Sequence, residues 1–399
     1  MSEPKPVRER TLRSPLRFIP YAVDVWCVLL KAKDLARGHI KKVTVLGVDY
    51  AVFRDERGEV HGIEDRCPHR GIELSLGRVE GSHIRCVYHG WCIDGSSARI
   101  LGKEEEAAVE PSCLKRIVLR ERYGLVWCFI GDPDRAAAHP LPEITGYGRE
   151  DSVDMLIRKP IASHWSYTFD NGIDLFHFGL HAEVPFFFRI LSLENFGSEK
   201  DRFTVHYRAI MPDYFGRNRE GDLFIHVDGN VFRLDMGEHL RIHGVSTPVS
   251  SNGRQIEMWW FISIFAPKRP RPVLRLLRPL FKYQISRGFQ QDVDVLESEQ
   301  RAFDDGLRVQ RETNPAVYAA HEYLINSVIE QALAMAPNLT VENVSSSSLL
   351  PQALRGEIGI IFDDGEEIAV IDPEQNQDRL LELGDLKVGR YQHLVMVRP

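Results

Sequence analysis

The sequence predicts an α+β fold with two domains, and three observations support this prediction. Short β-prone runs occupy the first third of the chain, and further strands and helices follow in separate groups rather than in regular βαβ units. A length of 399 residues suits two domains, and the Pro-containing stretch Gly131–Pro142 indicates a boundary. We expect an N-terminal all-β domain over residues 18–145. A second domain is expected over residues 146–399, and it also includes residues 1–17.

The first domain reads as short strands joined by turns. Three compact β-prone runs lie at Lys42–Leu46, Tyr50–Phe53 and Val60–Ile63, and the DERG sequence at Asp55–Gly58 is typical of a hairpin turn. The apolar run Gly124–Ile130 predicts a buried strand.

The second domain mixes element types. Three strand-like runs are predicted, at Arg202–Ile210, Leu223–Leu234 and Gln255–Phe265. Three helices are predicted, at Asp170–His181, Phe281–Phe303 and Ala316–Met335. Near the end of the chain, Gly356–Ile371 predicts a hairpin.

Composition and charge exclude several classes of function. The formal net charge of −7 provides no basic surface for nucleic acid, so we expect no such partner. No apolar run is long enough to span a bilayer, because residues 18–30 are too few and include Asp24. The charged N-terminus lacks the features of a secretory signal, and six cysteines are too few for a disulfide scaffold of this length, so we expect a cytoplasmic location. The sequence has no dinucleotide-binding glycine fingerprint, so a redox enzyme would need a separate protein to oxidise a nicotinamide.

Two matched pairs of cysteine and histidine lie in the first domain: Cys67 with His69, and Cys86 with His89. Two thiolates and two imidazoles can hold either a tetrahedral zinc or a [2Fe–2S] cluster with both cysteines on one iron. In zinc fingers the cysteines usually pair with each other. Here each loop offers one residue of each type, which favours a two-iron cluster clasped between two loops.

This stretch, CPHRG…LSLG…CVYHGW, closely resembles the cluster-binding motif of Rieske proteins. The resemblance implies a Rieske [2Fe–2S] cluster bound by Cys67, His69, Cys86 and His89. Val87 departs from the family, which usually has proline at this position. The change affects the stiffness of the loop rather than the ligands.

A second constellation covers residues 170–181, with the sequence DNGIDLFHFGLH. On the expected helix, His177 and His181 are one turn apart on a shared face, and Asp174 lies beside His177. Two histidines with a carboxylate suit a metal ion. The segment resembles the N-x2-D-x2-H-x3–4-H segment of Rieske-type oxygenases, whose catalytic Fe(II) takes two histidines and one carboxylate. The resemblance implies that His177 and His181 are iron ligands.

The third ligand has two candidates on the helix predicted at Phe281–Phe303. Asp292 and Glu299 both lie on its apolar stripe, where an unpaired carboxylate is costly, whereas Asp294 points away. The pattern alone therefore leaves both open. In the family resembled here, the ligand aspartate precedes a glutamate by five residues, which matches Asp292 and Glu297 and implies Asp292.

Both motifs and their order resemble the α (catalytic) subunit of Rieske non-haem iron oxygenases, nearest the homotrimeric monooxygenase and O-demethylase branch. The resemblance covers about residues 18–305 and implies a helix-grip-like catalytic domain, in which helices flank an antiparallel sheet. It implies that a separate NAD(P)H-dependent reductase or ferredoxin supplies electrons. It also implies that O₂ oxidises an apolar aromatic or polycyclic small molecule. Hydroxylation, demethylation and desaturation are all compatible with it.

The resemblance also assigns a role to Asp174 in catalysis. We expect its carboxylate to accept a hydrogen bond from the ring N–H of His177 rather than to bind iron. In the family, the equivalent aspartate contacts a Rieske histidine of the neighbouring subunit, which would be His89 here, within a homotrimer. Two other functions stay open: a Rieske protein that only carries electrons, and a zinc-stabilised binding module. The first of these has no use for a second metal site.

Overall fold

A computed structural model describes residues 10–12, 15–18, 21–22, 24–102, 114–181, 188–199, 202–212, 217–265, 271–306, 310–321, 323–324, 327, 359–363, 366–371 and 393–396. The chain forms two compact units. Unit 1 comprises Met1–Ala22, Glu143–Pro248 and Asn252–Pro399, and unit 2 comprises Val23–Pro142 and Val249–Ser251. Residues 18–22 and 143–145, assigned to the first domain from the sequence, thus belong to unit 1. No helix in the described part of the chain combines the length and apolarity needed to cross a membrane.

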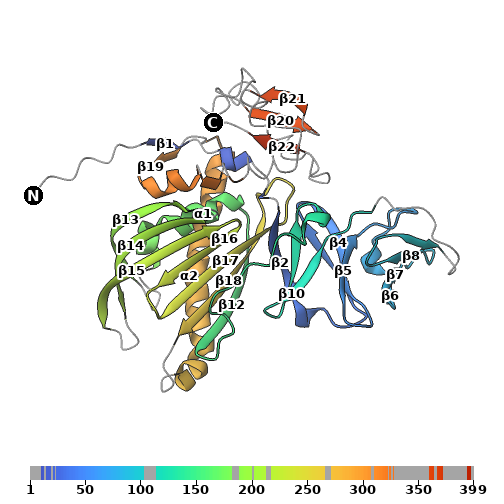
Figure 1. Cartoon of the computed structure of the whole chain (residues 1–399), viewed down its shortest axis with the longest axis horizontal. Helices are drawn as coiled ribbons and strands as arrows, with labels where there is room; N and C mark the ends of the chain where they lie inside the picture. The colour runs from blue at the N-terminus through green and yellow to red at the C-terminus, as the bar shows by residue number, and fades with distance from the viewer. Residues whose placement is uncertain are drawn as a thin grey trace, which may run out of the picture. The chain divides into compact units, whose positions relative to one another are not determined.

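Within the described residues, unit 2 forms three small antiparallel sheets (Figure 1). In sheet order their strands are β10 (Leu119–Arg122), β11 (Leu125–Ile130) and β2 (Val25–Lys31); β3 (Ile40–Val45), β4 (Val48–Arg54) and β5 (Val60–Glu64); and β6 (Arg78–Glu80), β7 (His83–Arg85), β8 (Cys92–Asp94) and β9 (Ile100–Gly102). Short 3-10 helices connect them at η2 (Ala32–Asp34), η3 (Leu74–Leu76) and η4 (Pro133–Arg135). The four strands predicted here are confirmed as β3, β4, β5 and β11.

The core of unit 2 follows from the apolar strands. All six residues of β11 are buried, because this strand pairs with β10 on one side and β2 on the other. A second core cluster contains Phe53, Ile63 and Ile84 together with Cys67 and Cys86. The two cysteines are therefore packed among apolar side chains at the inner side of their loops.

Unit 1 is dominated by a seven-stranded antiparallel sheet (Figure 1). Within the described residues its strand order is β12 (Ser152–Ile161), β18 (Ile256–Phe265), β17 (Leu240–Pro248), β16 (Val231–Met236), β15 (Asn218–Asp228), β14 (Arg202–Pro212) and β13 (Arg189–Glu199). Strand β18 is almost wholly buried and has a partner on each side, as its continuous apolar sequence predicts. The α+β fold class is confirmed.

Helices cover one face of this sheet. The elements are η1 (Pro15–Phe18), α1 (Trp165–Ile173), η5 (Leu175–His181) and α2 (Arg271–Asp304), and residues 315–321 are also helical. The hydroxyl of Tyr207 on β14 donates to the carbonyl of Ile173 at the end of α1 (2.8 Å). On α2, the ring of Phe289 stacks on Trp260 of β18 at 4.3 Å between centroids. These contacts hold both helices against the sheet.

Two sequence-based expectations are wrong in detail. Residues 170–181 do not form one α-helix, because α1 ends at Ile173 and η5 follows it. The carboxylate of Asp174, between the two, accepts the N–H of Phe176 (3.2 Å). Such a local side-chain contact competes with helical hydrogen bonding. The run Leu223–Leu234 is not one strand, since β15 and β16 meet in a hairpin at Gly229, which has φ +55°.

Other elements agree with the sequence. Helix α2 contains the predicted 281–303 segment and begins ten residues earlier, with Pro279 inside it. The strands β20 (Gly359–Asp363) and β21 (Glu366–Ile371) pair as an antiparallel hairpin, and β22 (His393–Met396) adds to β20. Much of the helix predicted at 316–335 lies outside the described residues.

The N-terminal segment is tied to distant parts of unit 1. Strand β1 (Arg10–Leu12) pairs with β19 (Gln310–Glu312). Arg17 is buried, forms an ion pair with Asp170 of α1 and lies over the ring of Tyr167. The other carboxylate oxygen of Asp170 contacts Nε2 of His321. One aspartate thus joins three segments that are far apart in the sequence.

Candidate metal centres

Two loops of unit 2 carry the four ligands predicted there, and both loops close in the same way. In each loop the cysteine N–H donates to the carbonyl five residues on, at 2.7 Å for Cys67 and 2.8 Å for Cys86. The cysteine carbonyl accepts the N–H of a glycine, Gly71 in the first loop (2.8 Å) and Gly90 in the second (3.1 Å). Both glycines have φ +72°, a conformation that other residues rarely adopt. Backbone hydrogen bonds therefore close each loop in the same shape.

The cysteines lie inside these loops and the histidines lie outside. Cys67 and Cys86 are each only 3% exposed, and burial is the largest cause that raises the pKa of the Cys67 thiol. Nδ1 of His69 lies 3.1 Å from Nδ1 of His89, and the His69 ring stacks on Trp91. The ligand atoms therefore form one sulfur pair and one nitrogen pair.

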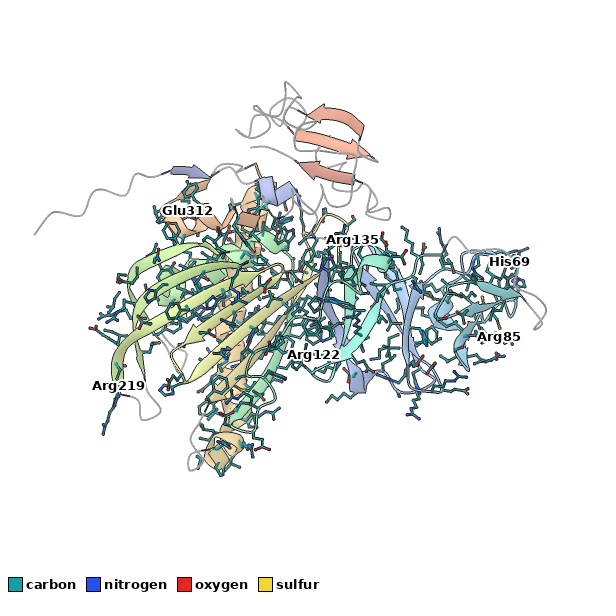
Figure 2. The ribbon with its side chains drawn as sticks, viewed as in Figure 1. His69, Arg85, Arg122, Arg135, Arg219 and Glu312 are labelled. Carbon is teal, nitrogen blue, oxygen red and sulfur yellow. The ribbon has the colours of Figure 1, made fainter. Side chains whose placement is uncertain are left out.

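A second contact fixes the loop that carries His89. Arg85 on β7 donates from its guanidinium to the carbonyl of Gly90 (2.9 Å) and to Glu80 (2.6 Å). Figure 2 labels His69 and Arg85, which lie at the same end of unit 2.

This arrangement suits two metal atoms better than one. Within the described residues, three or more ligand atoms come within 4.8 Å of one another in two groups, and neither contains Cys67, His69, Cys86 or His89. A single tetrahedral zinc would need all four ligand atoms around one point. A [2Fe–2S] cluster with cysteines on one iron and histidines on the other needs two separate pairs, which is what the loops provide.

The second predicted site lies in unit 1. His177 and His181 on η5 and Asp292 on α2 form one of the two groups whose ligand atoms lie within 4.8 Å of one another. Oδ1 of Asp292 is 3.0 Å from Nε2 of His181 and 3.5 Å from Nε2 of His177. The 3-10 turn brings both histidines to the same carboxylate although they are not on an α-helix. Two histidines and one carboxylate are the donor set of mononuclear non-haem iron sites.

Electrostatics favour the ionised carboxylate at this site. Burial alone would raise the pKa of Asp292, but hydrogen bonds to His177 and His181 outweigh it and lower the pKa to about 2. Burial alone would lower the pKa of His181, but Asp292 outweighs it and raises that pKa. The carboxylate and the two imidazoles are joined by hydrogen bonds, and a divalent cation can replace the protons of these bonds.

Two acceptors orient the imidazole rings. Nδ1 of His181 lies 3.0 Å from Oε1 of Gln291, and Nδ1 of His177 contacts the backbone carbonyl of Asp174 (2.5 Å). With each Nδ1–H donated to its oxygen, the proton that each Nε2 shares with Asp292 is the one that a metal would replace. Both rings are therefore oriented to bind a metal through Nε2.

Asp174 differs from the expectation in one respect. Its backbone carbonyl, not its carboxylate, contacts His177. The carboxylate accepts from Nδ2 of Asn314 (2.9 Å) and from the N–H of Phe176 (3.2 Å). The reason is the break between α1 and η5, which turns the Asp174 side chain away from the imidazole.

The structure separates the two carboxylates that the sequence pattern left open. Asp292 lies with the histidines, whereas Glu299 is not part of the group. Burial is the largest cause that raises the pKa of Glu299 to about 7, and the neighbouring charge of Asp170 adds to it.

Comparison with known proteins identifies unit 2. The family description "Rieske [2Fe-2S] domain" matches residues 25–112. Unit 2 is a Rieske domain. This match accounts for the paired ligand atoms and excludes a zinc knot as the reading of this unit.

Similarity to a curated protein covers more residues than the match to the Rieske domain does. A 4β-methylsterol monooxygenase of Methylococcus capsulatus is 34% identical over 207 residues, which are 50% of this chain and 56% of that protein. The chain spans about half or less of the length of the leading curated relatives it matches.

Solved structures share the fold over about three quarters of this chain. Dicamba monooxygenase bound to 3,6-dichlorosalicylic acid aligns with a TM-score of 0.62 at 16% identity, over 77% of this chain and 98% of that one. The oxygenase in a reduced oxygenase–ferredoxin complex of carbazole 1,9a-dioxygenase aligns with a TM-score of 0.57 at 18% identity, over 76% and 89%. At these identities the likeness shows the fold.

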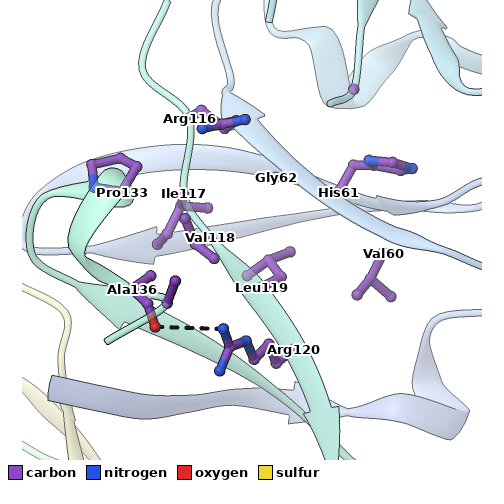
Figure 3. Close-up of a pocket in the computed structure, with 12 residues that line it drawn as sticks. Val60, His61, Gly62, Arg116, Ile117, Val118, Leu119, Arg120, Pro133 and Ala136 are labelled. Carbon is purple, nitrogen blue, oxygen red and sulfur yellow. Dashed lines mark hydrogen bonds between the residues drawn. The ribbon is translucent and has the colours of Figure 1, made fainter. Parts of the chain in front are cut away.

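A cavity in the Rieske domain lies apart from its ligand loops (Figure 3). It has a volume of about 310 Å³ and is lined in part by His61, Arg116 and Arg120. Arg120 donates to the carbonyl of Ala136 (3.4 Å), as the dashed line shows. None of the predicted metal ligands lines this cavity, so we assign it no role in either centre.

Residues that support the unit 1 site were not found from the sequence. Gln291 precedes Asp292 directly, and its amide on a helix that carries a ligand is a signal that could have found it. Asn171 donates to Oδ1 of Asp292 (3.3 Å) and occupies the asparagine position of the motif. Asn314 links Asp174 to Tyr207, and nothing in its sequence context indicates this.

Proposed function

We propose that this chain is the oxygenase component of a Rieske non-haem iron oxygenase system. One observation carries the proposal: the same chain holds a Rieske domain and, in unit 1, a separate group of His177, His181 and Asp292. When bound, the cluster supplies single electrons and the ferrous iron supplies a site for O₂. A protein that only carries electrons needs the first centre and not the second.

The role of unit 1 is to hold ligands and exclude water. Gln291 and the Asp174 carbonyl fix the imidazoles, and Asn171 donates to the ligand carboxylate. His181 and Asp292 are 6% and 7% exposed, so little water reaches them. A bound iron would be held by these three side chains, with two of them shielded from water.

An apolar polycyclic compound is the substrate class that we favour. The relative named as a 4β-methylsterol monooxygenase supports oxidation of a methyl group on a fused-ring substrate. Other relatives are named for aromatic acids, as in 3-chlorobenzoate-3,4-dioxygenase, so aromatic substrates form the comparison class. The electrons come from a separate reductase or ferredoxin, and the solved oxygenase–ferredoxin complex supports this.

A homotrimer is part of this proposal. Val87 and Tyr88 are more than half exposed beside His89, and Phe176 is 53% exposed beside His177. These apolar surfaces flank the two centres and suit contact between the Rieske loop of one copy and η5 of the next. Electrons would then pass from His89 through Asp174 to His177 across that contact.

Metal analysis with product analysis tests the proposal. The purified protein should contain about three irons and about two acid-labile sulfides per chain and show visible Rieske absorption. Supplied with a surrogate reductase and ¹⁸O₂, it should oxidise at least one member of a panel of 4-methylsterols and simple aromatic acids, detected by mass spectrometry. About two irons per chain without turnover would leave an electron carrier, and a colourless protein with one zinc would overturn the proposal.

A further inference from the structure

The first half of α2 has a charge unlike the rest of the molecule. Residues 271–287, here called the α2 arm, contain five cations and no acidic residue, whereas the whole chain has a net charge of −7. The cations are Arg271, Arg275, Arg278, Lys282 and Arg287. Acidic residues appear on this helix only from Asp292 onward. The arm is therefore a local positive region on an acidic protein.

The same arm exposes large apolar side chains. Leu276 is 78% exposed and Tyr283 is 62% exposed. The exposed apolar side chains of the arm are Val273, Leu276, Leu277, Leu280 and Tyr283. At about 100° per residue these five positions fall within an arc of about 120° on one side of the helix. Scattered apolar residues on a surface need no explanation, but a continuous stripe of this kind marks an interaction site.

This stripe is not the face that packs on the sheet. Leu274, Phe281, Ile285 and Phe289 lie on a different side of the helix and are half-buried, and Phe289 stacks on Trp260. Figure 1 shows the first turns of α2 extending past the ends of the neighbouring strands. The arm thus has one apolar face that anchors it to unit 1 and a second apolar face without a cover among the described residues.

Most of the cations lie opposite the exposed stripe. Arg271, Arg275, Arg278 and Lys282 fall within about 60° of one another, on the side away from Leu276 and Leu280. An apolar face with a polar face rich in arginine and lysine is the pattern of a helix that lies in a membrane interface. A second copy of the same arm offers no negative charge to complement these cations, whereas an anionic lipid surface does.

We propose that the α2 arm docks this protein on the surface of an anionic phospholipid bilayer. The apolar stripe enters the boundary between headgroups and acyl chains. Arg287 lies within the arc of the stripe and reaches the lipid phosphates, whereas the other cations attract the anionic surface across the width of the helix. This inference goes beyond the proposed oxygenase function and is independent of turnover. Docking would place a protein that acts on an apolar molecule at the membrane in which such molecules dissolve.

Vesicle binding by the intact, cluster-containing protein tests the proposal. The wild-type protein should co-sediment with vesicles of phosphatidylcholine containing 30% phosphatidylglycerol and bind pure phosphatidylcholine vesicles far more weakly. Binding should weaken as NaCl rises from 0.05 to 0.5 M, because the charges become screened. Arg287→Gln should weaken binding about fivefold, and Arg275→Gln, on the far side of the helix, should weaken it less.

The apolar stripe is tested by a matched pair of variants. Leu276→Gln combined with Leu280→Gln should abolish vesicle binding, while visible Rieske absorption shows that the protein is folded. Val295→Gln is the control, because Val295 is 39% exposed on the same helix but lies beyond the arm, next to Asp294. Equal binding to neutral and anionic vesicles, or full binding by the double variant, would overturn the proposal. A change of oligomeric state by light scattering, with no vesicle binding by the wild type, would assign the stripe to a second copy instead.

Discussion

The two candidate centres are built on opposite principles. In the Rieske domain, backbone hydrogen bonds and one left-handed glycine close each ligand loop, so a short stretch of sequence fixes the ligand positions. In unit 1, side chains from η5 and α2 meet at one point, and the side chains of Asn171 and Gln291 contact them. A centre closed by local backbone hydrogen bonds is therefore little affected by substitutions elsewhere in the chain. A centre assembled from side chains depends on residues that never touch the metal.

The largest expected effect comes from removing the carboxylate on which the unit 1 site converges. Asp292→Ala should abolish turnover and deplete the mononuclear iron, a loss greater than the roughly 100-fold that outer contacts of a metal site cost. Visible Rieske absorption should be unchanged. Iron analysis and product formation are the measurements, with Asp294→Ala on the exposed face of α2 as the control. An active Asp292→Ala protein beside an inactive Glu299→Ala protein would show that the ligand is Glu299.

The converse change tests the Rieske domain. Cys86→Ser should remove the visible Rieske absorption, because the sulfur pair then lacks one thiolate, while Co(II) binding at the unit 1 site is retained. Absorption spectra and Co(II) titration measure the two centres separately. Cys92→Ser, which changes a cysteine outside the ligand loops, should keep the normal spectrum. A normal spectrum in Cys86→Ser would contradict the ligand assignment.

An intermediate effect is expected where the proposed electron path joins the two centres. Asp174→Asn keeps an oxygen that can accept from Asn314 and Phe176, so both metals and the oligomeric state should survive. Turnover should fall by about 10- to 100-fold, because the neutral amide no longer attracts His89 of the neighbouring copy across the proposed contact, while the backbone carbonyl of residue 174 still contacts His177. The measurement is single-turnover oxidation of the reduced cluster with substrate and O₂. Oxidation at the wild-type rate would remove Asp174 from the path.

A smaller effect is expected at Gln291, whose side chain supports a ligand of the unit 1 site. Gln291→Leu removes the acceptor for Nδ1 of His181 and should weaken Fe(II) or Co(II) binding at the unit 1 site about tenfold. Gln290→Leu, on the neighbouring exposed position, should bind metal as the wild type does. Metal titration of the metal-depleted unit 1 site gives the affinities. Equal affinities in the two variants would show that His181 is held by packing alone.

The smallest expected effect is on acid stability. Burial alone would raise the pKa of Asp170, but Arg17 and His321 outweigh it and lower the pKa from 3.8 to about 2. Because the folded-state pKa is depressed, the stabilisation is complete above pH 4 and is lost as the pH falls from about 4 to about 2. The expected contribution is about 2 kcal/mol. In thermal unfolding, the difference in Tm between wild type and Asp170→Asn should narrow over this range, and a constant difference would contradict the assignment.

Much of the Rieske domain could be predicted from the sequence because its signals are local. The strands β3, β4 and β5 follow one another with short turns, and each ligand loop is a contiguous motif. In unit 1 the local signals were weaker. The Asp-Gly turn between β15 and β16 was missed within an otherwise strand-like run, and the break at Asp174 was missed because apolar periodicity continues across it.

The choice between Asp292 and Glu299 could not be made from helical periodicity. Residues seven apart differ by only about 20° around an α-helix but by about 10 Å along it. The face of the helix is therefore readable from the sequence, whereas the height at which η5 crosses α2 is a tertiary property. The contact of Gln291 with His181 depends on the same crossing, and periodicity contains no information about it.

The contacts of Asp170 with Arg17 and His321 have a consequence for how the chain folds as it is synthesised. Arg17 leaves the ribosome early, but His321 follows roughly 300 residues later, on the order of 15–60 s at usual translation rates. Strand β1 likewise waits for β19. Val23–Pro142 is contiguous and can fold and bind its cluster during that interval. The basic N-terminal segment therefore emerges first and is among the last parts of unit 1 to reach its partners.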